Sequence, residues 1–203
     1  GTDGASHNDM WDMTIAGLMP GVRVCAPRDA AELDRALDEA VAVADAPTVI
    51  RFSKQNPPAP LPALREAGAV DVLRDPEPGQ DVDLLIVGVG EMATTAMAVA
   101  EKLAADGLGV QVVDPRWCVP VSPDLVRLAA GAKTVAVVED NLVVGGVGSQ
   151  VTQALREAGL PVPCQVHGIP KRFLGHASRG EILEEIGLTP DAIADRIAGT
   201  MAP

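Results

Sequence analysis

Hydrophobic and polar positions follow one pattern in residues 1–54 and another from residue 65 onward. In the first stretch, short apolar runs stand between polar turns, and such runs predict brief strands and helices. The expected elements are a helix, a strand, a helix and a strand, over residues 10–18, 22–26, 30–44 and 47–52. These elements are too few for a complete doubly wound domain. We therefore expect the stretch to be the C-terminal part of one.

The second expected helix has the clearest signal of this stretch. Leu33 and Leu37 recur four positions apart, with Ala40 and Val41 one turn further on, which is the apolar stripe of an amphipathic helix. Asp29 stands at its start and Glu32 follows three positions later, a spacing typical of a capping box.

From residue 65 onward, apolar runs and amphipathic segments alternate regularly. Strands are expected over residues 68–73, 83–90, 109–114, 133–140 and 163–169. Helices are expected between and after them, starting at about residues 94, 122, 146, 179 and 189. The run at 83–90 is continuously apolar, as in a strand buried on both faces of a parallel sheet. The alternation predicts an α/β fold with an open, mainly parallel sheet.

A proline-rich segment separates the two stretches. Residues 55–64 contain four prolines, which fix φ and lack an N–H, so this segment is expected to be an extended connector. The resulting division has three parts. Residues 1–54 end one domain, residues 55–64 are a linker, and residues 65–203 form a second domain.

Charge and composition exclude several classes of function. The 203 residues carry a formal net charge of −12, which disfavours nucleic-acid binding because it repels the phosphate backbone. Cys25, Cys118 and Cys164 are widely spaced and odd in number, so neither a zinc site nor a disulfide framework is expected. Reduced thiols and the lack of a long apolar run predict a cytoplasmic protein that does not enter membranes.

Two glycine-rich segments each follow an expected strand and open a helix. The first, residues 88–96, lacks the third glycine of a dinucleotide-binding fingerprint, so a tight strand-to-helix turn is expected there. The second, residues 145–149, suits either an anion at the helix N-terminus or close packing against its neighbours. The carboxylates of Glu139 and Asp140, at the end of the preceding strand, favour the packing role.

Two pairs of residues carry candidate chemistry. His7 follows Asp3 by four positions in a polar loop, an arrangement suited to proton transfer or carbonyl polarisation. Arg51 and Lys54 stand at the end of an expected strand, where ligands of parallel sheets gather, and two cations there suit a phosphate monoester. The plain alternatives are an idle surface histidine and a solvated strand end.

Several short motifs occur in one order from end to end of the chain. They are Asp3-Gly4-Ala5-Ser6-His7-Asn8, Met10-Trp11-Asp12, Pro20-Gly21, Ala26-Pro27-Arg28-Asp29, Pro47-Thr48, Arg51-Phe52, Asp114-Pro115-Arg116-Trp117, Val138-Glu139-Asp140-Asn141, Gly145-Gly146-Val147-Gly148-Ser149 and His176-Ala177-Ser178-Arg179. Together they resemble the C-terminal part of the actinobacterial 1-deoxy-D-xylulose-5-phosphate synthase family, which belongs to the thiamine-diphosphate-dependent transketolase superfamily. The Glu-Asp-Asn and Gly-Gly-Val-Gly-Ser motifs are the most specific.

This resemblance implies both an architecture and a reaction. Residues 1–54 would be the end of a pyrimidine-binding α/β domain, and residues 65–203 a transketolase C-terminal domain. The family condenses pyruvate, with loss of CO₂, and glyceraldehyde 3-phosphate to 1-deoxy-D-xylulose 5-phosphate, a precursor of isoprenoids and thiamine. It implies catalytic roles for His7 and Asp3, and binding of the substrate phosphate by Lys54 and Arg51.

The resemblance also implies cofactors and partners. The family uses thiamine diphosphate and Mg²⁺, whose binding segments match no part of this chain, so the chain alone is expected to be inactive. A homodimer, or pairing with an N-terminal chain of the same enzyme, would complete the site. The alternatives are a relative of transketolase or of a 2-oxo acid dehydrogenase β subunit, and a non-catalytic oligomerisation fragment.

Three positions depart from the family pattern. Asp9 stands where the family usually has glycine, and Ser53 and Gln55 stand where it has proline and glycine. An added carboxylate near a phosphate site opposes binding of an anion. These departures allow a different acceptor substrate or a weakened enzyme.

Overall fold

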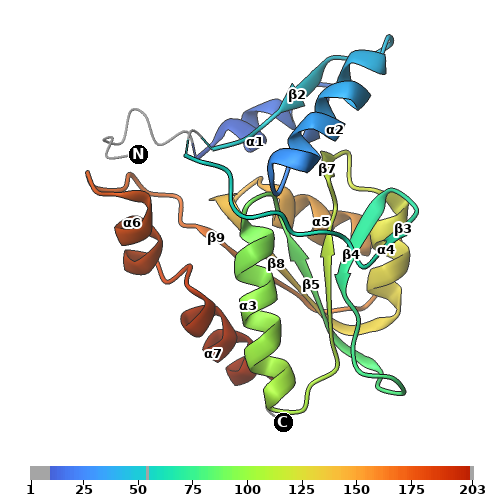
Figure 1. The fold of residues 1–203 in the computed structure, drawn as a ribbon, viewed down its shortest axis with the longest axis vertical. Coiled ribbons are helices and arrows are strands. Elements are labelled where there is room, and N and C mark those ends of the chain that lie inside the picture. Colours follow the sequence, from blue (N-terminus) through green and yellow to red (C-terminus); the bar gives the residue numbers. More distant parts are fainter. Residues whose placement is uncertain (1–9, 54, 202–203) are drawn as a thin grey trace.

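The computed structural model describes residues 10–53 and 55–201 of the chain (Figure 1). Its elements, in chain order, are α1 (Asp12–Ala16), β1 (Arg23–Cys25), α2 (Ala30–Ala42), β2 (Thr48–Ile50), β3 (Arg65–Ala67), β4 (Val70–Arg74), β5 (Val82–Gly88), α3 (Met92–Ala105), β6 (Val110–Asp114), β7 (Trp117–Val119), α4 (Pro123–Ala130), β8 (Ala132–Leu142), α5 (Val147–Glu157), β9 (Cys164–Ile169), α6 (Arg179–Glu185) and α7 (Pro190–Met201). Strands and helices alternate through most of the chain, as the hydrophobic pattern predicts.

The larger sheet has the strand order β3-β4-β6-β5-β8-β9. Strands β6, β5, β8 and β9 are parallel to one another, whereas β3 and β4 form an antiparallel extension at one side. The predicted α/β fold with a mainly parallel sheet is confirmed. Parallel strands need crossover helices, and these helices cover both faces of the sheet.

The side chains of the central strands alternate between two hydrophobic cores. In β5, Leu84 and Ile86 pack on the face covered by α3 and α7, while Leu85 and Val87 pack on the face covered by α4 and α5. All four are fully buried. This two-sided burial explains why the strand reads as a continuous apolar run in the sequence.

A smaller sheet joins the two stretches of the chain. Its order is β2-β1-β7, with β1 and β2 parallel and β7 antiparallel to β1. Because β7 follows the larger sheet's strand β6, this pairing attaches the N-terminal elements to the C-terminal unit through backbone hydrogen bonds. In Figure 1, α1, β2 and α2 lie together at one end of the molecule, above the larger sheet.

Three sequence expectations need correction. Strands β3 and β7 were not expected, and β3 pairs with the outer side of β4. Of the predicted apolar stripe of α2, Ala40 is buried together with Ala36, but Leu37 and Val41 are 53% and 80% exposed. The expected capping box is half formed. Asp29 accepts the Glu32 N–H at 3.0 Å, but the Glu32 carboxylate turns to Arg28 and Arg116.

Residues 55–64 contain no helix or strand, as expected of a connector. The segment is nevertheless tied to the protein at Leu61, whose N–H donates to Asp29 at 2.9 Å and whose carbonyl accepts from Arg28 at 2.7 Å. The three cysteines are free thiols, as predicted. No helix in the part of the chain that the structure describes is long and apolar enough to cross a membrane.

Candidate functional site

Arg51 lies at the carboxyl end of β2, where the sequence places it. Its N–H donates to the Cys25 carbonyl at 2.9 Å, so the backbone is still paired with β1. Its Nε donates to Asp12 at 3.1 Å. One terminal guanidinium nitrogen binds the Asp140 carboxylate, and the other donates to the Asp140 carbonyl at 3.3 Å. The guanidinium therefore links β2 to α1 and to the end of β8.

Asp140 receives a second arginine on its other oxygen. Arg179, at the start of α6, donates to Asp140 Oδ2 at 2.7 Å. The Asp140 side chain is only 3% exposed. Burial alone would raise its pKa, but the charges of Arg51 and Arg179 outweigh burial and hold the pKa below its ordinary value. The pairing of β8 with β9 shifts register between Val138 and Leu142, and such irregularities redirect side chains at functional edges of sheets.

The predicted phosphate-binding role of Arg51 stays a prediction. The contacts of its guanidinium show which acceptors a phosphate would have to compete with. Each of its guanidinium nitrogens has a protein acceptor, so a phosphate would have to share donors with Asp12 and Asp140. The other predicted site residues, Asp3, His7 and Lys54, lie outside the described residues.

A cleft adjoins the segment that follows Arg51. Its volume is about 230 Å³. Apolar walls and a few polar groups line it, namely Pro27, Arg28, Asp29, Leu33, Phe52, Ser53, Gln55, Pro57, Pro58 and Glu91. The Ser53 hydroxyl accepts the Gln55 N–H at 3.0 Å. Two of the positions that depart from the family pattern, Ser53 and Gln55, therefore lie in the wall of this cleft and are joined by this hydrogen bond.

The glycine-rich helix start binds a carboxylate of the chain itself. Glu139 accepts the N–H groups of Val147 and Gly148 at 2.8 and 2.9 Å, at the N-terminus of α5. A Cβ on Gly146 would lie 2.6 Å from the same carboxylate. Burial raises the pKa of Glu139 to about 7, although these two N–H groups oppose the rise. The packing role predicted for this segment is confirmed, because a Cβ on Gly148 would also lie 2.4 Å from Val166.

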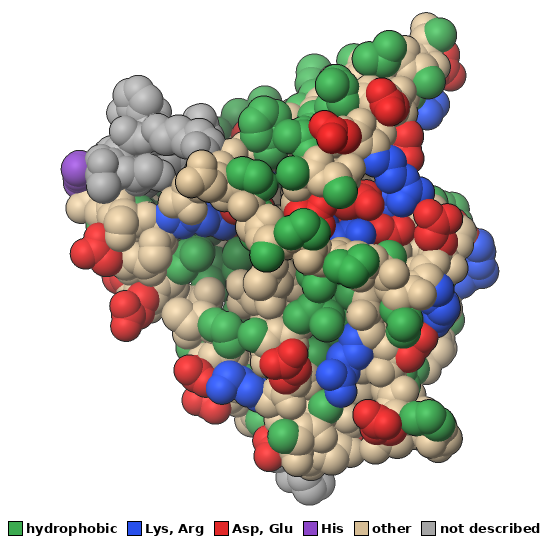
Figure 2. Space-filling model, viewed as in Figure 1, with side chains coloured by type: hydrophobic (Ala, Val, Ile, Leu, Met, Phe, Trp, Pro, Cys, Tyr) green, Lys and Arg blue, Asp and Glu red, His purple; other side chains and the backbone are tan. Residues whose placement is uncertain are grey.

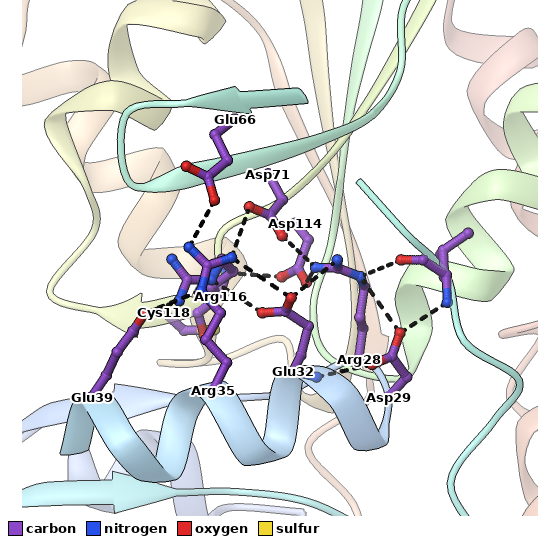
Figure 3. A network of polar contacts seen from close by, with 11 residues as sticks. Arg28, Asp29, Glu32, Arg35, Glu39, Glu66, Asp71, Asp114, Arg116 and Cys118 are labelled. Atoms are coloured by element: carbon purple, nitrogen blue, oxygen red, sulfur yellow. Dashed lines mark hydrogen bonds and ion pairs between the residues drawn. The ribbon is translucent and has the colours of Figure 1, made fainter. Parts of the chain in front are cut away.

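A second polar cluster holds the two units together (Figure 3). Arg28, which follows β1, points between Asp71 and Asp114, which come from β4 and β6, and one of its terminal nitrogens donates to both at 2.7 Å. Arg28 is 3% exposed. Burial raises the pKa of Asp114 to about 6, against the lowering effect of Arg28.

Residues of α2 extend this cluster toward the surface. Arg116 donates to Glu32 at 3.2 Å and also binds Glu39. The Trp117 indole N–H donates to Glu39 at 2.6 Å, and Arg35 reaches Glu66 at 2.8 Å. The Ala26-Pro27-Arg28-Asp29 and Asp114-Pro115-Arg116-Trp117 motifs therefore face each other across the junction. Sequence reasoning noticed both motifs but not their pairing, and the one available signal was that each follows a strand.

Two polar side chains, Asn141 and His167, are buried near this edge. Among the described residues, neither polar atom of Asn141 has a hydrogen-bond partner, and the same holds for Nε2 of His167. Burial, followed by the charge of Arg196, lowers the pKa of His167 to about 4, so this histidine is neutral at physiological pH. Both residues lie near the end of the β8–β9 pair.

The structure defines a protein of two α/β units, in which a small unit with the parallel strands β1 and β2 docks on a larger, mainly parallel sheet. Charged residues collect at the carboxyl ends of the strands. The chain belongs to the transketolase family. The family described as "Transketolase, C-terminal domain" matches residues 74–193, and "Transketolase, pyrimidine binding domain" matches residues 1–60.

Curated relatives carry the name anticipated by the resemblance. The chain is 52% identical over 206 residues to 1-deoxy-D-xylulose-5-phosphate synthase of Mycobacterium avium (strain 104), a match that covers 100% of the chain and 32% of the relative. It is 54% identical over 200 residues to 1-deoxy-D-xylulose-5-phosphate synthase 2 of Kitasatospora griseola, covering 97% and 32%. The chain thus spans about a third of the length of these relatives.

Solved structures agree with the fold. A structure titled "Split gene transketolase, inactive beta4 tetramer" superimposes with a TM-score of 0.82 at 28% identity, covering 97% of this chain and 63% of that one. A transketolase mutant from Pichia stipitis superimposes with a TM-score of 0.77 at 19% identity, covering 98% and 28%, and supports the fold alone.

The described residues do not build a metal site. Across residues 10–53 and 55–201, no group of three or more His, Cys, Asp or Glu side chains is placed to hold a metal ion. Residues of this part of the chain therefore do not fit the Mg²⁺ that the family resemblance implies.

Proposed function

We propose that this chain is part of a thiamine-diphosphate-dependent synthase that joins pyruvate and glyceraldehyde 3-phosphate into 1-deoxy-D-xylulose 5-phosphate with release of CO₂. One observation carries the proposal, namely about 50% identity, from end to end of the chain, to proteins of that name. The division into residues 1–54, 55–64 and 65–203 belongs to the same proposal, as does a cytoplasmic homodimer that uses Mg²⁺.

In this proposal, thiamine diphosphate supplies the chemistry at the donor carbon, and residues outside the described part of the chain bind it. This chain contributes the acceptor side of the site. His7 would hold or move a proton near the reacting carbon, with Asp3 beside it. Lys54 and Arg51 would attract the acceptor's phosphate at the carboxyl end of β2.

The test is product analysis with the full-length protein. Incubation with pyruvate and glyceraldehyde 3-phosphate should release CO₂ and yield a five-carbon deoxy sugar phosphate in equal amounts. A transketolase-like relative would instead transfer a two-carbon unit from a ketose phosphate without CO₂. His7→Ala should lower turnover by about 100-fold or more with little loss of thermal stability. Unchanged turnover would remove His7 from the proposed mechanism.

A second candidate is a subunit that assembles without activity of its own. It is favoured by the split-gene transketolase relative, whose title describes an inactive β4 tetramer and of which this chain covers 63%. Product analysis of the full-length protein separates the two candidates, because only the first predicts turnover. Titration of the 203-residue chain with thiamine diphosphate and Mg²⁺ tests what the two share, and tight binding by this chain alone would contradict both.

A further inference from the structure

We propose that Asp140 is a positioning residue for the acceptor-binding edge, because its buried carboxylate holds Arg51 and thereby fixes the backbone of Phe52 and Ser53 against the C-terminal unit. The inference rests on the proposed function, which assigns acceptor binding to this edge. It concerns a residue that would touch neither substrate nor cofactor.

Asp140 is poorly placed to act directly. Its side chain is 3% exposed, and each carboxylate oxygen is occupied by a different arginine. A carboxylate that is buried and doubly paired is held in its ionised form and has no face left for a ligand. Any effect of Asp140 on substrate binding must therefore pass through Arg51 or Arg179.

Arg51 is fixed at the end of β2 and so sets the path of the residues that follow it. Its backbone is bound to β1 through the Cys25 carbonyl, while its side chain is bound to Asp12 and Asp140. Phe52 and Ser53 come next and line the cleft beside this edge. Since Arg51 is fixed at both backbone and side chain, the segment after it leaves β2 in a defined direction.

Arg179 binds the second carboxylate oxygen of Asp140. It starts α6, directly after Ser178, whose capping box with Glu181 fixes the helix start. Two guanidinium groups close to one carboxylate would repel each other without it. Loss of the negative charge should therefore release the end of β2 and the start of α6 together, although they are far apart in sequence.

The first experiment measures amide hydrogen exchange, which requires no activity. In the full-length protein, Asp140→Asn should raise exchange by about tenfold both in residues 48–53 and in the first turn of α6. Asp75→Asn is the matched control, because Asp75 also binds an arginine, Arg65, at 2.8 and 2.9 Å and an amide, Gln111, at 2.7 Å. It should leave both segments unchanged. Unaltered exchange at residues 48–53 in Asp140→Asn would overturn the proposal.

The second experiment separates positioning from plain stability. Asp140→Asn should raise KM for the phosphorylated aldehyde by about tenfold and leave KM for pyruvate within about twofold. Arg51→Lys keeps the charge but loses the fork, so it should show the same rise in amide exchange at residues 48–53, and this readout serves if the asparagine variant does not fold. The double variant should be no worse than the more affected single variant.

Equal shifts in KM for both substrates, or a fall in Tm with both KM values unchanged, would overturn the positioning role. A wild-type protein that releases no CO₂ from pyruvate would instead refute the proposed function, and the exchange experiment would still decide whether Asp140 holds the edge.

Discussion

At the scale of single residues, burial decides which charged pairs matter for stability. Arg28 is 3% exposed and binds Asp71 and Asp114, which are themselves buried. Arg23 and Asp45 also form a pair, at 3.3 Å, but their side chains are 45% and 79% exposed. Water screens the second pair and leaves the first in a low-dielectric environment, so the two should differ widely in their contribution to stability.

Arg28→Met should therefore lower the free energy of unfolding by about 3–5 kcal/mol, because it leaves two buried carboxylates without their counter-charge. Arg23→Met is the control and should cost less than about 1 kcal/mol. Urea denaturation of both variants measures the difference. Similar costs for the two would show that the buried cluster does not hold the junction.

Glu139 makes stability depend on pH in a direction that can be worked out. Its pKa in the folded protein is about 7, above the ordinary 4.5, so between these values the folded state keeps a proton that the unfolded state has lost. The contribution of Glu139 to stability should fall as pH rises from 4.5 to 7 and level off above. Relative to Glu139→Gln, the wild type should lose on the order of 1–3 kcal/mol across this window.

The comparison is made as a difference at each pH, because other groups titrate in the same range. His167, with its pKa lowered from 6.5 to about 4, costs stability as pH falls through that interval, but it is present in both proteins and cancels. If the difference between wild type and Glu139→Gln stays flat from pH 4.5 to 7, Glu139 is ionised throughout.

Sequence reasoning succeeded at residues whose chemistry is local. The Asp29 cap and the place of Arg51 at a strand end depend on neighbours a few positions away, and both are found as predicted. The contacts of Asp140 with Arg51 and Arg179 could not be predicted. Asp140 is 89 positions from Arg51 and 39 positions from Arg179. Charge pairing between residues so far apart in the sequence depends on how the two units dock. Local sequence patterns carry no information about that docking.

At the scale of elements, length and burial decide what can be predicted. Strands β5 and β8 have 7 and 11 residues and contain the apolar stretches Leu84–Val87 and Val135–Val138, and both strands were anticipated. Strands β3 and β7 have three residues each and were missed. β3 carries two polar residues and depends on its hairpin with β4. β7 is a strand only because β1, from the other unit, pairs with it.

Two glycines test how tightly the start of α5 is packed. A Cβ at Gly146 would lie 2.2 Å from the Leu142 carbonyl oxygen, whereas one at Gly180, inside α6, would meet nothing within 4 Å. Gly146→Ala should lower the free energy of unfolding by about 1–3 kcal/mol, because the backbone must shift. Gly180→Ala should raise it by up to about 1 kcal/mol through helix propensity. Thermal or urea unfolding measures both, and a neutral Gly146→Ala would contradict the close packing.

At the scale of the whole molecule, exposed apolar side chains gather at one end. Figure 2 shows hydrophobic side chains gathered where Figure 1 places α1, β2 and α2. The large exposed hydrophobic residues of residues 10–53 are Ile15, Leu18, Met19, Leu37, Val41 and Phe52. Strand β2 pairs with β1 on one side, and in the described part of the chain no strand pairs with its other side. An apolar, unprotected strand edge is a surface that proteins normally cover.

The last prediction is that this surface is buried in a longer form of the protein, since the curated relatives are about three times as long as this chain. Val41, 80% exposed here, is the most sensitive probe. In a full-length protein, Val41→Lys should cost about 1–3 kcal/mol of stability, because a charge would enter an apolar contact. In the 203-residue chain the same change should cost less than about 0.5 kcal/mol and reduce self-association, measured by urea denaturation and sedimentation.

Leu64→Lys is the control, at a residue 64% exposed at the C-terminal end of the connector. It should lower the stability of either length of chain only slightly. An equally small loss of stability from Val41→Lys in the full-length protein and in the 203-residue chain would mean that this face of α2 is exposed to water in both. Leu37 and Val41 would then pack against no partner.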